Sequence, residues 1–199
     1  MHPLPKTRLP LFPLPVVLFP SAPMPLHIFE PRYRQMVHRC LEGDRRFGLI
    51  YHDADAGGPF LMEEGRVGCV AEIEDFQPLP DGRSLLVARG VERFAIDDGI
   101  ESREPYYEGL VAPYEDVPED PGRLEAQRRR TMTLFEAVVR SLADDPDTLP
   151  ELEPSGEVSF PLVRSVQVEA GWQQAFLELR SEIHRLERLD AVFQAVLDA

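Results

Sequence analysis

Proline is concentrated at the start of this 199-residue chain and limits how that region can fold. Nine of the 20 prolines lie in residues 1–31, several of them within the apolar run Leu9–Pro20. Proline disrupts helices and lacks the N–H that a central strand donates, whereas a disordered tail would not carry so many Leu, Val and Phe residues. We therefore predict extended segments packed on a core, over Leu9–Phe12 and Val16–Phe19, with a turn at Pro20–Pro23. An exposed polyproline docking peptide is the alternative, and it would carry fewer large aliphatic residues.

The pattern then changes to helical spacing and afterwards to short apolar runs. Pro31 suits a first helical turn, and Gly43 ends a stripe of apolar residues at helical intervals, formed by Tyr33, Met36, Val37, Cys40 and Leu41. In the middle third, turn residues such as Pro80-Asp81-Gly82 and Asp97-Asp98-Gly99 separate the apolar runs. This spacing predicts a sheet closed into a small barrel. The predicted strands are 47–51, 67–73, 84–88, 93–96 and 106–113.

After Pro118 the sequence predicts helices. Asp120-Pro121 is a helix-start signal, and the helix that follows ends near Ala143. We expect an acidic loop over Asp144–Pro154, then a short helix after Ser159. The C-terminal stripe, from Trp172 to Val196, predicts one long amphipathic helix or two helices joined near Ser181. We place a boundary near residue 117, with a β-rich part over 1–117 and a helical part over 118–199.

Charged residues exclude several classes of protein. Lys6 is the single lysine and follows proline, so the chain lacks a Walker A lysine, a Schiff-base lysine and a serine–lysine dyad. The net charge of −14 disfavours nucleic-acid binding. However, residues 1–50 carry seven basic and three acidic side chains, a net +4, against −18 for the remainder. An RNA-binding module is therefore the alternative function, with a local basic surface formed by Arg32, Arg34, Arg39, Arg45 and Arg46.

Cysteine usage and hydropathy indicate the compartment. Cys40 and Cys69 show neither CxxC spacing nor the density of a disulfide scaffold, so we interpret them as reduced, buried thiols. No stretch approaches 18 apolar residues, and proline interrupts the N-terminal run too often for a signal peptide. We expect a cytoplasmic protein.

No spacing of chemistry-bearing side chains identifies a catalytic or metal site. The five histidines lack metal-ligand spacing, and no serine lies in a Gly-x-Ser-x-Gly elbow. Adjacent acids such as Glu63-Glu64 and Asp144-Asp145 are expected in so acidic a chain. Asp53–Gly58 comes closest to a calcium loop, but it lacks the third oxygen ligand and the terminal glutamate. We predict a protein that is not an enzyme and needs no metal or cofactor. A third hypothesis, ranked below protein binding and RNA binding, is a small-molecule hydrolase that uses an unrecognised carboxylate pair.

Apolar side chains near the N-terminus are the candidate binding residues. The simplest interpretation places them in the core, and several of them exposed together would instead mark a protein-contact surface. The candidates are Phe12, Phe19, Met24, Phe29, Tyr33 and Phe60.

An ordered series of segments resembles a known family. In chain order these segments are Leu9–Leu14, Val17–Pro20, Pro25–Tyr33, Phe47–Ile50, Val67–Ile73, Pro80–Arg83, Arg89–Phe94 and Gln174–Glu178. The series resembles the N-terminal domain of Lon protease, and especially the stand-alone bacterial proteins built on that domain without its ATPase and protease domains. The acidic loop fits the family pattern poorly, and the family has no catalytic residues in this region that could be transferred.

The resemblance implies an α+β fold, with a PUA-like small β-barrel followed by a helical subdomain. It also implies a role in recognising unfolded or tagged polypeptides. Our leading hypothesis is a non-enzymatic module that holds exposed hydrophobic or extended segments, by pairing with an open strand edge or in an apolar groove near the barrel–helix junction. The expected partners are unfolded polypeptides, with a separate protease or chaperone and a second copy of the chain as further candidates.

Overall fold

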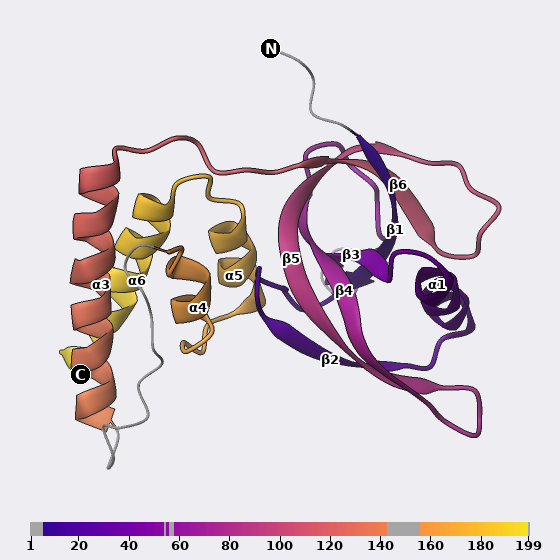
Figure 1. Cartoon of the computed structure of the whole chain (residues 1–199), viewed down its shortest axis with the longest axis horizontal. Helices are drawn as coiled ribbons and strands as arrows, with labels where there is room; N and C mark the ends of the chain where they lie inside the picture. Colours follow the sequence, from indigo (N-terminus) through magenta and orange to yellow (C-terminus); the bar gives the residue numbers. More distant parts are fainter. Residues whose placement is uncertain (1–5, 54, 56–57, 143–155, 199) are drawn as a thin grey trace. The chain divides into compact units, whose positions relative to one another are not determined.

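The computed structural model describes residues 6–53, 55, 58–142 and 156–198. These residues form a mixed fold of one six-stranded sheet and several helices (Figure 1). In chain order the elements are β1 (Thr7–Leu14), β2 (Pro23–Ile28), α1 (Pro31–Glu42), β3 (Arg46–Tyr51), β4 (Val67–Pro78), β5 (Ser84–Gly99), β6 (Tyr107–Pro113), α3 (Pro121–Leu142), α4 (Ser159–Val163), α5 (Ala170–Leu177) and α6 (Glu182–Leu197).

Contacts group the chain into two compact units. The sheet unit comprises residues up to 115 together with 169–178, and the helical unit comprises 116–168 and 179 onward. Helix α5 therefore belongs with the sheet, because the Gln174 side chain donates to the Val67 carbonyl at 3.0 Å and the Phe176 ring lies 5.9 Å from that of Phe19. The predicted division into a β-rich part over 1–117 and a helical part over 118–199 stays a prediction.

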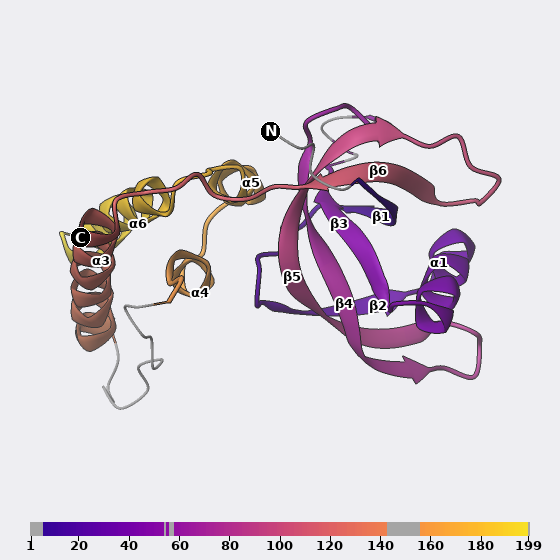
Figure 2. The same cartoon turned by 45° about the horizontal axis from the view of Figure 1, so that its top comes forward.

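The strands of the sheet unit pair in the order β2-β5-β4-β3-β1-β6, and β6 also pairs with β5. The pairings therefore run in a ring through β5, β4, β3, β1 and β6. β2 lies outside this ring and pairs with the first part of β5, Ser84–Arg89. β1 and β3 are parallel and the other pairs are antiparallel. Figure 2 shows the strongly coiled strands, with α1 beside them. The Tyr33 ring of α1 lies 4.1 Å from the Phe12 ring of β1.

Two glycines create the space for the ring of Phe94 inside this unit. A Cβ on Gly48 would lie 2.7 Å from Phe94 Cζ, and a Cβ on Gly68 would lie 2.6 Å from the same atom. Any larger residue at either position would displace the ring. Around Phe94 the core contains Leu9, Leu11, Ile50, Phe60, Val70, Ile96 and Val111.

The proline-rich start folds partly as predicted. The extended segment at Leu9–Phe12 is confirmed within β1, where Leu9, Leu11 and Phe12 are buried. The predicted packing of Val16–Phe19 on the core is confirmed for Val17, Leu18 and Phe19, which are buried, although the segment forms no strand. The turn is found at Pro20–Ser21. The sequence analysis missed strand β2, which contains Pro23 and Pro25.

Turn chemistry was predicted well at one hairpin and wrongly at another position. Gly82 has a φ of +81°, and the Asp81 carboxylate accepts from the Arg83 N–H at 3.1 Å, which confirms the turn between β4 and β5. The turn predicted at Asp97–Gly99 is wrong, since β5 continues through Gly99 with a register shift between Ile96 and Asp98. A bulge accommodates the polar residues without ending the strand.

In the helical unit, α3 and α6 run in the same direction. Arg128 of α3 contacts Glu182 at the start of α6, and Phe135 lies 5.5 Å from Phe193 farther along both helices. The alternative of two C-terminal helices is confirmed, because the Ser181 hydroxyl accepts from the His184 N–H at 3.1 Å and caps α6. The predicted acidic loop Asp144–Pro154 lies outside the described residues.

Both cysteines are free and buried, as predicted. Burial raises the pKa of each thiol to about 12, so neither Cys40 nor Cys69 is a reactive thiolate near neutral pH. Among the described residues, no helix has the length and hydropathy needed to cross a bilayer.

The buried carboxylate of Glu108 makes the stability of the sheet unit depend on pH. Its carboxylate is buried and accepts from Arg8 at 3.0 and 2.5 Å. Burial alone would raise its pKa, but hydrogen bonds from Arg8 and Ser102 and the charges of Arg8 and Arg39 outweigh burial and lower the pKa below 4.5. A carboxyl with a lowered folded-state pKa stabilises the fold above the unfolded-state value, and this stability is lost as pH falls through the folded-state value.

We therefore expect the wild type to lose more stability than Glu108→Gln as pH is lowered from 7 to below 4.5, measured by urea unfolding at each pH. Glu74→Gln is the matched control, because Glu74 also pairs with an arginine across two strands but is exposed. The control is expected to follow the wild type within about 0.5 kcal/mol. If the free energy of unfolding depends on pH in the same way for the wild type and Glu108→Gln, the lowered pKa of Glu108 is contradicted.

Candidate functional site

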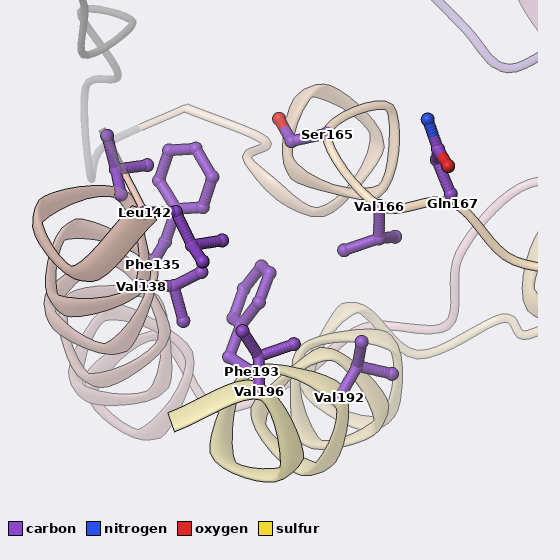
Figure 3. A pocket seen from close by; sticks show the side chains of 10 residues that line it. Phe135, Val138, Leu142, Ser165, Val166, Gln167, Val192, Phe193 and Val196 are labelled. Atoms are coloured by element: carbon purple, nitrogen blue, oxygen red, sulfur yellow. The ribbon is translucent and has the colours of Figure 1, made fainter. Parts of the chain in front are cut away.

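An apolar groove lies within the helical unit, between α3, α6 and the segment after α4 (Figure 3). Its volume is about 580 Å³, within the range of ligand sites in proteins. We call it the α3–α6 groove. It is lined by Phe135, Val138, Val139 and Leu142 of α3, by Ser165, Val166 and Gln167, and by Val192, Phe193 and Val196 of α6.

The groove follows from apolar stripes that are longer than the packed part of each helix. Phe135 and Val138 are buried, whereas Leu142, one turn farther along α3, is 73% exposed. On α6, Phe193 is buried and Val196 is 38% exposed. Figure 3 shows Phe193 projecting between the helices. The buried residues therefore form the floor, and the exposed residues extend the same apolar surface to the rim.

The chemistry of this lining suits binding rather than catalysis. None of its ten residues carries a charge, and only Ser165 and Gln167 bear polar side chains. An apolar cavity of about 150 Å³ holds one benzene molecule, so this groove has room for several apolar side chains. It can remove such side chains from water, at about 25 cal/mol for each Å² buried.

A buried polar cluster holds the elements around the groove together. Arg185 of α6 is 0% exposed and binds both oxygens of Asp116 at 2.7 and 2.6 Å. The same guanidinium donates to the Ser159 hydroxyl of α4 and to the Leu179 carbonyl, and it lies 4.4 Å from the Phe160 ring centre. One side chain therefore joins α4, which leads into the groove lining, to α6 and to the segment before α3.

The structure separates the six predicted site residues by burial. Phe12, Phe19, Tyr33 and Phe60 are buried, Met24 is half-buried, and Phe29 is 58% exposed. Most of the set therefore forms core, and only Met24 and Phe29 present appreciable surface. Their part in protein binding stays a prediction.

Phe29 belongs to a small apolar surface on the sheet unit. Its ring lies 5.7 Å from that of His27, and His27 is paired in register with Leu85, which is 43% exposed. The neighbouring strand edge is poor for adding a peptide strand. Pro23 and Pro25 of β2 provide no N–H, so two of its six residues cannot donate to an added chain.

The arginines of the first 50 residues do not form a free basic surface. Of the five arginines predicted to form it, three pair with carboxylates, a fourth donates to a backbone carbonyl, and the fifth, Arg34, is exposed. The pairs are Arg32 with Glu30 at 2.9 Å, Arg39 with Glu104 at 2.8 Å, Arg46 with Glu72 at 2.8 Å, and Arg45 with the Ile73 carbonyl at 2.8 Å. Such pairing disfavours phosphate binding, and the RNA-binding alternative is not supported.

Within the described ranges, no three His, Cys, Asp or Glu residues gather in a way that could hold a metal ion. The calcium-like segment Asp53–Gly58 falls partly outside those ranges, because residues 54, 56 and 57 are not described.

Comparison with known proteins gives the family. The family model for the ATP-dependent protease La (LON) substrate-binding domain matches residues 8–189. The chain belongs to the Lon substrate-binding domain family. The predicted resemblance is confirmed, and the matched domain is not itself catalytic.

Curated relatives and solved structures agree with this assignment. A Lon protease of Xanthomonas oryzae is 26% identical over 87% of the chain, and a Lon protease 2 of Herpetosiphon aurantiacus is 29% identical over 67%. The chain spans about a fifth of the length of these relatives, 21% and 17%.

Among solved structures, the Lon N-terminal domain protein of Xanthomonas campestris is 27% identical, with a TM-score of 0.66 over 93% of this chain and 98% of that one. The N-terminal domain of a Mycobacterium avium complex Lon protease shares the fold, with a TM-score of 0.71 over 94% of this chain and 98% of that one, at 14% identity.

The sequence analysis did not predict the groove, although it covered the helices that line it. Phe193 and Val196 belong to the predicted C-terminal stripe, and Phe135, Val138 and Leu142 recur at helical intervals in the helix predicted to end near Ala143, so both sets were interpreted as buried contacts between helices. The signal that could have revealed the groove is the length of the two stripes. Each stripe continues to the last turn of its helix, and the sequence pattern does not show which element would cover that turn.

Proposed function

We propose that this domain recognises polypeptides by holding their exposed apolar side chains in the α3–α6 groove. The observation that carries the proposal is the uncharged lining of the groove, about 580 Å³ in volume, in a member of the Lon substrate-binding domain family. An unfolded chain exposes apolar side chains that a folded protein buries. A groove of this kind therefore distinguishes unfolded segments from folded surfaces without reading a particular sequence.

Two rim residues provide the test, because their side chains are exposed and replacing them should leave the fold intact. Burial of one leucine or valine side chain contributes about 1.5–3 kcal/mol. We therefore expect Leu142→Asp and Val196→Asp each to weaken binding of a labelled peptide rich in leucine and phenylalanine at least about tenfold. Fluorescence anisotropy measures the affinity, and circular dichroism checks the fold.

Leu85→Asp is the matched control, because Leu85 is also an exposed aliphatic residue but lies on the sheet unit. Its affinity for the peptide is expected to equal that of the wild type. If Leu85→Asp weakens binding and the two groove variants do not, the binding surface is the one around His27 and Phe29. If the wild type binds no apolar peptide while folded, the proposed function is wrong.

We further propose that the ring of strand pairings is a small PUA-like barrel that supports this role in the cytoplasm. Cleavage of a bound client is assigned to protease activity outside these 199 residues, because their one lysine, Lys6, pairs with Asp97 on the surface. Mixing the protein with an unfolded client and no other protein is then expected to leave the client intact on a gel.

A further inference from the structure

The backbone of Gln167, in the lining of the α3–α6 groove, offers one hydrogen-bond donor and one acceptor. Just before it, the Val166 N–H donates to the Val163 carbonyl at 3.3 Å and completes the turn after α4, and α5 then begins at Ala170. Within the described ranges, neither the N–H nor the C=O of Gln167 has a hydrogen-bond partner. Gln167 is exposed, so a bound chain can reach both groups.

The side chains beside these two groups alternate as they do along a β-strand. In Figure 3, Val166 points into the groove, toward α6, whereas Gln167 points away from it. Glu169, at the end of the same segment, has an extended backbone, with φ −62° and ψ 149°. An extended residue presents its N–H and C=O on one side, where one residue of an antiparallel strand exchanges two hydrogen bonds with it. The segment therefore offers a place for one pair of strand residues at the edge of the groove.

We propose that the groove binds its client as an extended chain, whose main chain pairs with Gln167 and whose alternate side chains enter the groove. This inference rests on the proposed function and adds the conformation that the client adopts. The donor and acceptor of Gln167 complement the C=O and N–H of any residue except proline, so these bonds do not depend on the client's sequence. Because successive side chains of a strand point to opposite faces, apolar residues at alternate positions of the client face the lining.

An amphipathic helix is the other polypeptide form that fits an apolar groove, and it lacks this complementarity. The N–H and C=O groups in the middle of a helix are already bonded to one another, so a helical client forms no such pair with Gln167. An unfolded segment has these groups available. The unpaired backbone of Gln167 therefore favours an extended client over a helical one.

Peptides methylated on the backbone nitrogen test the inference without a change in the protein. Two labelled peptides share one apolar sequence, and one carries N-methyl groups at its odd positions and the other at its even positions. Each has therefore lost the donors of one strand edge. One net hydrogen bond changes an equilibrium about twofold to tenfold. By fluorescence anisotropy on the full chain, we expect one methylated peptide to bind more weakly by this factor and the other to bind as the unmodified peptide does.

Gln167→Pro tests the same pair from the side of the protein, because proline has no N–H. We expect it to weaken binding of the unmodified peptide about twofold to tenfold, with circular dichroism as the check on the fold. Gln167→Ala is the matched control. It keeps both backbone groups and removes only a side chain that points away from the groove, so its affinity is expected to equal that of the wild type.

Hydrogen exchange of the wild type, followed by mass spectrometry, gives a readout that needs no variant, since pairing is expected to slow exchange of the Gln167 amide. If the unmodified peptide binds but both methylated peptides lose affinity equally, or neither does, the proposed function stands and extended pairing is overturned. An unslowed Gln167 amide in the bound protein, or an equal loss in Gln167→Ala and Gln167→Pro, has the same meaning. No binding of the unmodified peptide by the folded protein would overturn both.

Discussion

Replacing Arg185 by methionine is expected to lower the free energy of unfolding of the helical unit by about 3 kcal/mol. The substitution leaves the Asp116 carboxylate and the Ser159 hydroxyl without the donor that they share, and breaking a buried ion pair costs about 3–5 kcal/mol. We expect the lower end of this range because Asp116 is 32% exposed and water can partly replace the guanidinium. Hydrogen exchange of the α6 amides, followed by mass spectrometry, measures the loss in this unit.

Arg129→Met is the matched control for Arg185. Arg129 of α3 forms an ion pair with Glu125 at 2.5 Å, but both side chains are more than half exposed. Exposed pairs of this kind contribute about 0.3–0.5 kcal/mol. If Arg185→Met costs no more than Arg129→Met, the cluster does not hold α4 to α6. In that case the wall of the groove formed by Ser165–Gln167 must be positioned by apolar packing alone.

Replacing Phe94 by alanine is expected to destabilise the sheet unit by about 3–5 kcal/mol, the range for large aromatic residues in cores. The ring occupies the space left by Gly48 and Gly68, and neither glycine has a side chain that could move into the cavity. Trp172 is the single tryptophan and stacks on Phe176 within this unit. Its fluorescence during urea unfolding therefore reports the change.

Phe29→Ala is the control for Phe94, because it makes the same chemical change at a side chain that is 58% exposed. Its effect on unfolding is expected to stay within about 0.5 kcal/mol. A cost for Phe94→Ala below about 1.5 kcal/mol would show that the strands collapse around the missing ring.

The local structure could be predicted where a single residue type decides it. Pro31 and Gly43 bound α1, and Asp81-Gly82 makes the turn between β4 and β5, because each of these residues acts through its own backbone or side chain. Strand β2 could not be predicted in this way. Pro23 and Pro25 argue against a strand unless it lies at an edge, and only the tertiary pairing with β5 places it there.

The candidate site was harder to predict than the fold for a related reason. Apolar periodicity shows which face of a helix avoids water, but not where the covering helix ends. Leu142 and Val196 fit their stripes as well as Phe135 does, and the structure alone shows that no helix among the described residues covers them. The same ambiguity applies to Phe12 and Phe29, which are similar in sequence context and opposite in exposure.

The prolines of β2 also affect how readily the sheet can add a further strand. Among the described strands, β2 pairs on one side only, and a free strand edge is a template on which a misfolded chain can grow into an aggregate. Pro23 and Pro25 interrupt the row of donors at this edge, so an incoming strand cannot form a continuous ladder there. This edge is thereby protected from becoming a site on which aggregated chains grow.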